Sequence, residues 1–116
     1  IGFFTKYGDG GVDIAPIADL MKSEVYAVGR KLGIIDDIIA APPTDGLFHD
    51  NRSDEQQLGA TYDELEWAMK FEEQGGSLEE LDDRQKQVID IYRLFNRSNR
   101  HKMEPIPVAV IPDELK

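Results

Sequence analysis

The chain has 116 residues, 41% of them hydrophobic, which is enough for one small domain. Its formal net charge of −10 argues against a nucleic-acid-binding surface, because phosphate backbones are bound by clustered lysine and arginine. No apolar run approaches the roughly 20 residues of a membrane span. There is no cysteine, which fits a reducing compartment and leads us to expect a cytoplasmic protein.

A glycine-rich, charged loop opens the chain at residues 2–13 (GFFTKYGDGGVD). Its glycines let the backbone turn or approach a ligand where a side chain would collide. Lys6, Asp9 and Asp13 place one cation and two anions around this bare backbone. Such a loop suits a polar, charged small molecule better than it suits packing. No methionine precedes the loop, so we expect the chain to begin in the middle of something larger.

Short elements are expected next. Alternation over residues 13–17 predicts a strand, stopped by Pro16. Asp19 is the expected N-cap of a helix that ends at Gly33. The apolar face of this helix consists of Met21, Val25, Val28 and Leu32.

A second, short helix is expected to start at Asp36, to bury Ile38 and Ile39, and to end before the two prolines at 42 and 43. Residues 42–52 show no periodicity and are rich in Pro, Gly, Asp and Asn. They predict a loop that is long for a small domain.

Three capping boxes then follow, each a Ser or Thr with Gln or Glu three residues later. The pairs are Ser53 with Gln56, Thr61 with Glu64, and Ser77 with Glu80. They predict a helix ending near Gly59, a helix that buries Leu65, Ala68 and Met69, and a last, longest helix. The apolar positions of that last helix are Val88, Ile91, Tyr92 and Phe95. Prolines at 105, 107 and 112 predict an extended tail.

The loop at residues 2–13, followed by Pro16 and Lys22, resembles the signature of the ammonia-dependent NAD+ synthetases. The likeness continues in order through Pro43-Thr44, residues 53–55, residues 62–65 and His101-Lys102, so it covers essentially the whole chain. The resemblance implies an α/β fold, Rossmann-like and of the adenine nucleotide α-hydrolase type. In that fold an S-G-G-x-D-S loop binds the ATP phosphates at a helix N-terminus. These 116 residues contain no such loop.

We therefore expect residues 1–116 to be the C-terminal half of a single synthetase domain, mostly helical with one or two short strands, and inactive alone. Residues 42–52 would be a mobile active-site loop that closes over ATP. The implied enzyme is a ligase of NAD+ biosynthesis that forms a carbon–nitrogen bond. ATP adenylates the nicotinate carboxylate of deamido-NAD+ and releases pyrophosphate; ammonia then displaces AMP. Mg2+ is expected with ATP, held by the half that this chain lacks, and the enzyme is expected to be a homodimer.

The resemblance also implies roles for single residues. Lys6 and Asp13 match positions that bind deamido-NAD+, and His101 and Lys102 match positions that contact it across the dimer interface. Lys22 and Thr44 match ATP-contacting positions. Asp9 lies where ammonia would be held, so it is the candidate for binding ammonium and accepting its proton.

The residues alone permit simpler interpretations. Lys6 would be a solvated surface lysine, Asp9 and Asp13 turn residues, and Thr44 a loop residue. His101 and Lys102 would be favourable cations at a helix C-terminus. Two alternative functions follow: the synthetase portion of a glutamine-dependent NAD+ synthetase, or a non-catalytic acidic helical interaction module. The latter gives no reason for a glycine-rich charged loop followed by Lys22 and Thr44.

Overall fold

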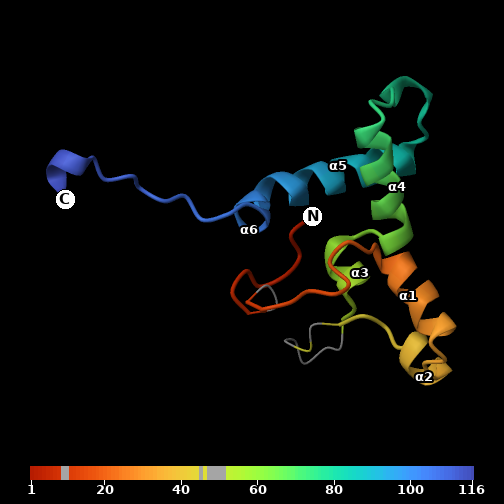
Figure 1. Ribbon diagram of the computed structural model, residues 1–116. Helices are drawn as coiled ribbons and strands as arrows, with labels where there is room; N and C mark the ends of the chain where they lie inside the picture. Colours follow the sequence, from red (N-terminus) through yellow and green to blue (C-terminus); the bar gives the residue numbers. More distant parts are fainter. Residues whose placement is uncertain (9–10, 45, 47–51) are drawn as a thin grey trace.

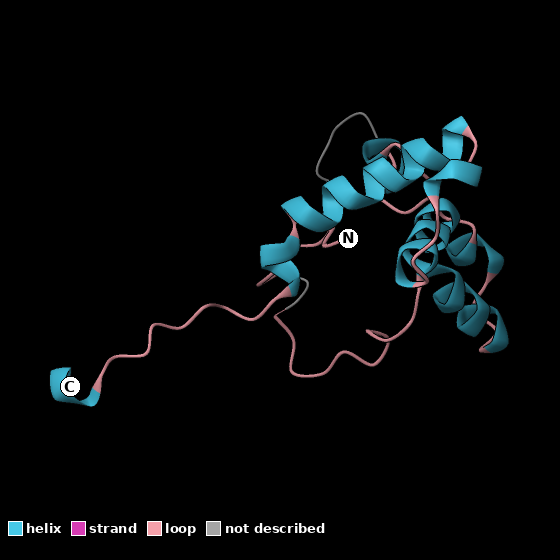
Figure 2. Cartoon of the chain, turned by 90° about the horizontal axis from the view of Figure 1, so that it is seen from above, coloured by secondary structure: helices cyan, strands magenta, loops and turns pink. Residues whose placement is uncertain are grey.

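The computed structural model describes residues 1–8, 11–44, 46 and 52–116 (Figure 1). These residues form six α-helices and two short 3-10 helices, and Figure 2 shows that helices and loops make up all of this described part. The strand expected over residues 13–17 is not confirmed by this structure. That segment contains a turn in which the Ala18 N–H donates to the Ala15 carbonyl at 3.1 Å. A strand needs a neighbour to pair with, and the described residues supply none.

Helix α1 (Lys22–Lys31) begins three residues later than the expected Asp19 cap. Its N-cap is Met21, whose N–H donates to the Glu24 carboxylate at 2.8 Å. Gly33, with φ of +75°, follows the helix as expected. Because Glu24 satisfies the Met21 amide from within the first turn, no capping side chain is needed at position 19.

Helix α2 (Asp36–Ile39) starts at the expected residue, but its burial differs from the expectation. Ile38 is 63% exposed, and only Ile39 is half-buried. The Ile39 side chain lies against Gly29 of α1, where an added Cβ would meet Ile39 Cδ1 at 2.7 Å. A four-residue helix presents one face to its neighbour, so Ile38 remains at the surface.

Helices α3 (Asp54–Leu58) and α4 (Tyr62–Glu73) confirm two capping boxes. The Ser53 hydroxyl accepts from the Gln56 N–H at 3.2 Å, and the Gln56 side chain accepts from the Ser53 N–H at 2.8 Å. In the second box, the Thr61 hydroxyl accepts from the Glu64 N–H at 3.2 Å, and the Glu64 carboxylate accepts from the Thr61 N–H at 2.8 Å. Gly59, with φ of +77°, ends α3 as expected.

The third capping box does not start the longest helix. Ser77 caps the 3-10 helix η1 (Leu78–Glu80), and α5 (Asp83–Ser98) is capped by Asp82. Gln85 completes that box, with the two hydrogen bonds at 2.8 and 3.0 Å. The chain then breaks at Asn99 into α6 (Arg100–Met103), so His101 and Lys102 lie on a separate short helix. An extended segment leads to η2 (Asp113–Leu115), which agrees with the expected tail.

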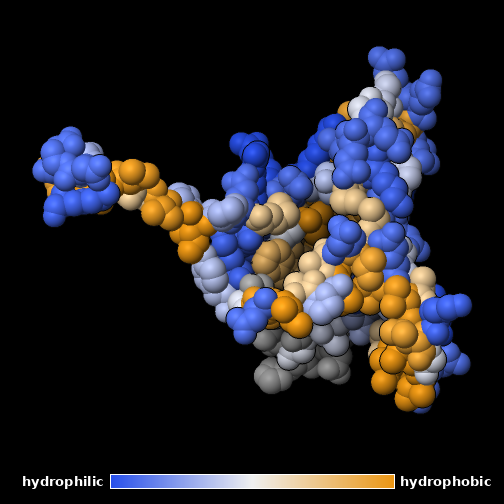
Figure 3. All heavy atoms as spheres, viewed as in Figure 1, coloured by the Kyte–Doolittle hydropathy of each residue, from blue (hydrophilic) through white to orange (hydrophobic). Residues whose placement is uncertain are grey.

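The core lies where α4 crosses α5 (Figures 1 and 2). Its buried residues are Leu58, Ala60, Leu65, Ala68, Val88 and Ile89. Two ion pairs join α4 to α5 beside this core, Arg84 to Glu64 and Arg93 to Glu72, each at 2.8 Å. Figure 3 shows hydrophobic residues on the surface of α2 and the adjoining part of α1. Among the helices described here, none is long and apolar enough to cross a membrane.

Candidate functional site

The opening loop lies against the end of α5 and the short helix α6 that follows it. The Lys6 ammonium donates to the carbonyl oxygens of His101 and Glu104, 95 and 98 positions away. Carbonyls at a helix C-terminus carry partial negative charge, so they suit a cation. Two of the residues expected to bind the same substrate, Lys6 and His101, are therefore brought together by folding.

The break at Asn99 fixes the start of this loop. The Asn99 side-chain amide donates to the Ile1 carbonyl at 3.0 Å, in a partly buried position. Gly2 has a φ of +65°, and a Cβ there would lie 2.6 Å from the Asn99 Cβ. Only glycine permits this close approach. Next to it, the Phe3 ring packs edge-on against Phe95, with centroids 6.4 Å apart.

The other residues expected at the substrate end are more open. The His101 ring is exposed, with Nδ1 3.1 Å from the Ser98 carbonyl, and Lys102 is half-buried. Asp13 is exposed on a bend. Asp9, the expected ammonia-binding residue, lies outside the described residues.

Lys22 lies at the other end of the candidate site, at the first position of α1. Its ammonium is 5.4 Å from the centroid of the Tyr26 ring and 5.5 Å from that of Tyr62, so two aromatic faces attract it. The next residue, Ser23, uses both its N–H and its hydroxyl to bind the Glu66 carboxylate, at 2.9 and 2.6 Å. A side-chain carboxylate thus already occupies the amide of Ser23, which leaves the Lys22 side chain as the group suited to an external anion.

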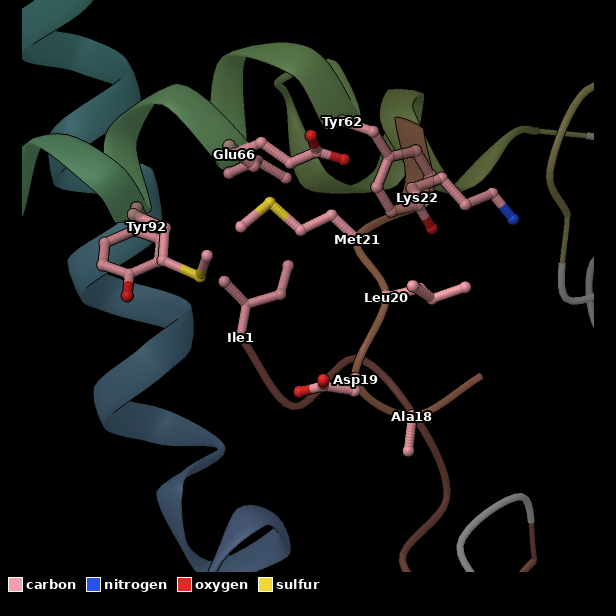
Figure 4. A pocket seen from close by; sticks show the side chains of 11 residues that line it. Ile1, Ala18, Asp19, Leu20, Met21, Lys22, Tyr62, Glu66 and Tyr92 are labelled. Carbon is pink, nitrogen blue, oxygen red and sulfur yellow. The ribbon is translucent and has the colours of Figure 1, made fainter. Parts of the chain in front are cut away.

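An open groove of about 530 Å³ lies beside this lysine, between the start of α1, α4 and α5 (Figure 4). In Figure 4 the Lys22 side chain points away from Ile1 and Tyr92, which stand at the opposite side of the groove. The remaining lining is largely apolar. It comprises Ala18, Asp19, Leu20, Met21, Tyr62, Leu65, Glu66 and Met69.

Tyr62 connects this lysine to the base of the long loop. Its hydroxyl donates to the Asp54 carboxylate at 2.9 Å. Burial, followed by the hydrogen bond and charge of Asp54, raises the pKa of the Tyr62 hydroxyl above its ordinary value, so the hydroxyl remains a donor. The Asp54 N–H in turn donates to the Pro43 carbonyl at 2.8 Å.

Thr44 follows directly after Pro43. Its hydroxyl accepts from the Gly46 N–H at 3.1 Å, which is the turn-residue arrangement that the simpler interpretation expects. A chain of contacts therefore runs from Lys22 through Tyr62 and Asp54 to the residue before Thr44. The expected ATP-contacting pair lies at the two ends of this chain.

Three residues at these positions were missed by sequence reasoning: Asn99, Tyr62 and Asp54. Residues 53–55 and 62–65 carry part of the resemblance described above, but nothing in them indicates a mutual contact. Asn99 gives no signal in the sequence, because its partners Ile1 and Gly2 are about a hundred positions away.

The described residues do not fit a metal site. Nowhere in this part of the chain do three or more His, Cys, Asp or Glu side chains gather closely enough to hold an ion. The Mg2+ expected with ATP is therefore not assigned to these residues.

The family model and the curated relatives that match this chain point to the same family. The family model described as NAD synthase matches residues 1–106. An NH(3)-dependent NAD(+) synthetase of Archaeoglobus fulgidus is 41% identical over 115 residues, covering 99% of this chain and 44% of that relative. Proteins of the same name from Syntrophomonas wolfei and Picrophilus torridus are 36% and 39% identical over 116 and 118 residues. Each of these two matches covers 100% of this chain, and 42% and 44% of the relative. The chain thus spans less than half the length of these relatives.

Proposed function

The chain belongs to the NAD synthase family, and we propose that it carries part of the site in which ATP and ammonia convert deamido-NAD+ to NAD+. ATP would adenylate the nicotinate carboxylate and release pyrophosphate, and ammonia would then displace AMP. The observation that carries this proposal is the family match over residues 1–106, which includes all seven residues expected to bind substrate or ammonia. The chain would form the C-terminal half of one Rossmann-like α/β domain. Residues 13–17 would then pair with a sheet that the rest of the domain supplies.

Lys6, Asp13, His101 and Lys102 would bind deamido-NAD+. This substrate is polyanionic, so cations are needed to offset the repulsion between phosphates. His101 and Lys102 would serve the neighbouring subunit of a homodimer, with Lys6 acting in its own subunit.

Lys22 and Thr44 would bind ATP. The Lys22 ammonium, held near two tyrosine rings, can face a phosphate, while Thr44 offers a hydroxyl and a backbone N–H. Residues 42–52 would close over the nucleotide, excluding water and protecting the adenylate from hydrolysis. The hydrogen bond between Asp54 and Pro43 supports a fixed base for such a loop.

Asp9 would hold ammonium and accept its proton. Only neutral ammonia is a nucleophile, and ammonium dominates at neutral pH, so the second step needs a proton acceptor. A carboxylate between glycines in the substrate loop is suited to this task.

Free ammonia is the nitrogen source that we favour over glutamine. The relatives described above are named NH(3)-dependent NAD(+) synthetases. The experiment is to supply the complete synthetase with ATP, deamido-NAD+ and either ammonium or glutamine. NAD+ formation with ammonium and none with glutamine supports the proposal. Formation with glutamine only, or no pyrophosphate release that depends on deamido-NAD+, contradicts it.

A further inference from the structure

Tyr62 is the first residue of α4. It contacts Lys22 directly and is linked through Asp54 to Pro43, the residue before Thr44. Its ring lies 5.5 Å from the Lys22 ammonium, and its hydroxyl donates to the Asp54 carboxylate at 2.9 Å. The side chain is half-buried and forms part of the groove wall in Figure 4. Its backbone N–H is also fixed, since it donates to the Glu55 carboxylate at 2.8 Å. Tyr62 therefore contacts both α1 and α3.

Asp54 links Tyr62 to Pro43 through two hydrogen bonds. It is the first residue of α3, and its N–H closes the base of the loop by donating to the Pro43 carbonyl. Thr44 is the next residue of the chain. A displacement of Asp54 would therefore move the backbone from which Thr44 projects.

We propose that Tyr62 is a positioning residue that sets Lys22 and Thr44 relative to one another. The inference rests on the proposed function, because only there do Lys22 and Thr44 contact ATP. The ring restrains the ammonium by a cation–π interaction, and the hydroxyl restrains the loop through Asp54. Tyr62 itself acts through its neighbours and need not touch the nucleotide. Small misplacements of binding groups are costly, since catalysis depends on held geometry.

The ring and the hydroxyl can be tested separately in the complete synthetase. Tyr62→Phe keeps the ring over Lys22 and removes the hydroxyl. Tyr62→Leu removes both. Asp54→Asn keeps an oxygen that can accept from Tyr62, so it is the conservative partner variant. Tyr26→Phe is the matched control, because it keeps the second ring beside Lys22 and leaves the Tyr62–Asp54 hydrogen bond intact.

We expect Tyr62→Phe to raise the KM for ATP about tenfold, the lower range for a lost hydrogen bond to a charged group, with Tyr62→Leu raising it further. The KM for deamido-NAD+ should stay within about twofold of the wild-type value, because that substrate lies at the Lys6 end. Tyr26→Phe should behave nearly as the wild type. Asp54→Asn should raise the KM for ATP less than Tyr62→Phe does, because its amide oxygen still accepts from the Tyr62 hydroxyl but carries no charge. A purely structural role would instead lower the melting temperature and change both constants alike, and that result would overturn the inference.

Two further measurements separate this inference from the function on which it rests. If Lys22→Ala and Thr44→Ala leave the KM for ATP unchanged, the assignment of ATP to these residues fails. If both raise it while Tyr62→Phe and Tyr62→Leu do not, only the positioning role fails. Without any nucleotide, the Lys22 ε-methylene protons should show an NMR ring-current shift that Tyr62→Phe retains and Tyr62→Leu reduces. An unchanged shift in Tyr62→Leu would also overturn the inference.

Discussion

Lys6 and Lys22 are held in different ways, and this difference bears on how each would meet an anion. Carbonyl oxygens at the end of α6 hold Lys6, whereas two aromatic faces hold Lys22. Both arrangements leave the ammonium charge formally uncompensated by a carboxylate among the contacts described here. In the part of the chain that the structure describes, a phosphate approaching either lysine would not have to displace a carboxylate from an ion pair with it.

Asp9 allows a test of the second half-reaction. Asp9→Asn in the complete synthetase should retain adenylate formation, measured as pyrophosphate release from ATP and deamido-NAD+. Amide formation should fall by about 10²–10⁴, the usual contribution of a positioned general base. Part of the loss should be recovered at higher pH, where free ammonia is more abundant.

The asparagine variant is informative because it keeps the size and turn-forming capacity of aspartate. A turn role alone therefore predicts a near-normal rate of amide formation. Equal loss in both half-reactions would instead place Asp9 in substrate or magnesium binding.

Local signals predicted the starts of α2, α3 and α4, but not those of α1 and α5. The boxes at Ser53 and Thr61 could be predicted because each depends on residues only three positions apart. The box at Ser77 was misassigned to the longest helix, since Asp82 and Gln85 offer a competing box five residues later. The strand at residues 13–17 is not confirmed for the opposite reason, because strand formation depends on a pairing partner that no local pattern reveals.

The same division applies to the candidate site. The opening loop, Lys22 and Thr44 could be singled out from residue type and order. Their contacts could not, because Lys6 and His101, or Ser23 and Glu66, are far apart in sequence. Roles that depend on such contacts, like that of Tyr62, need the folded chain.

The α4–α5 ion pair gives a pH-dependent prediction for the elements. The Arg84 guanidinium, with the capping hydrogen bond from Thr61, lowers the pKa of Glu64 from 4.5 to about 2. A lowered pKa in the folded state means that the ionised form stabilises the fold. This contribution is fully present above about pH 4.5 and is lost as the pH falls towards about 2.

Glu64→Gln keeps an oxygen for the Thr61 cap but removes the charge and one of the two oxygens that accept from Arg84. Because the pair is partly exposed, we expect the melting temperature at pH 7 to fall by only about 2–5 °C. The difference from the wild type should shrink as the pH approaches 2. Glu79→Gln, on η1, is the control and should change little. A difference that persists undiminished at low pH would show that the charge is not the cause.

The molecule as a whole has few groups for binding a nucleotide on its own. Its buried core consists of six residues among those described, its hydrophobic surface over α1 and α2 is open, and its sequence lacks the S-G-G-x-D-S loop. Lys22 and Thr44 provide too few donors to offset the entropy lost on binding. We therefore expect calorimetry of the 116-residue chain to show ATP binding in the millimolar range or weaker. Micromolar affinity would contradict this expectation.

We propose that the complete synthetase site has a dinucleotide end at Lys6 and an ATP end at Lys22. The most direct measurement is the pair of Michaelis constants, for deamido-NAD+ and for ATP, in Lys6→Ala and Lys22→Ala variants of the complete synthetase. Lys6→Ala should raise the first constant and Lys22→Ala the second, each by about tenfold or more for a lost charged contact, with melting temperatures near the wild-type value. Equal effects on both constants, no effect on either, or loss of the folded protein in Lys22→Ala would contradict the claim.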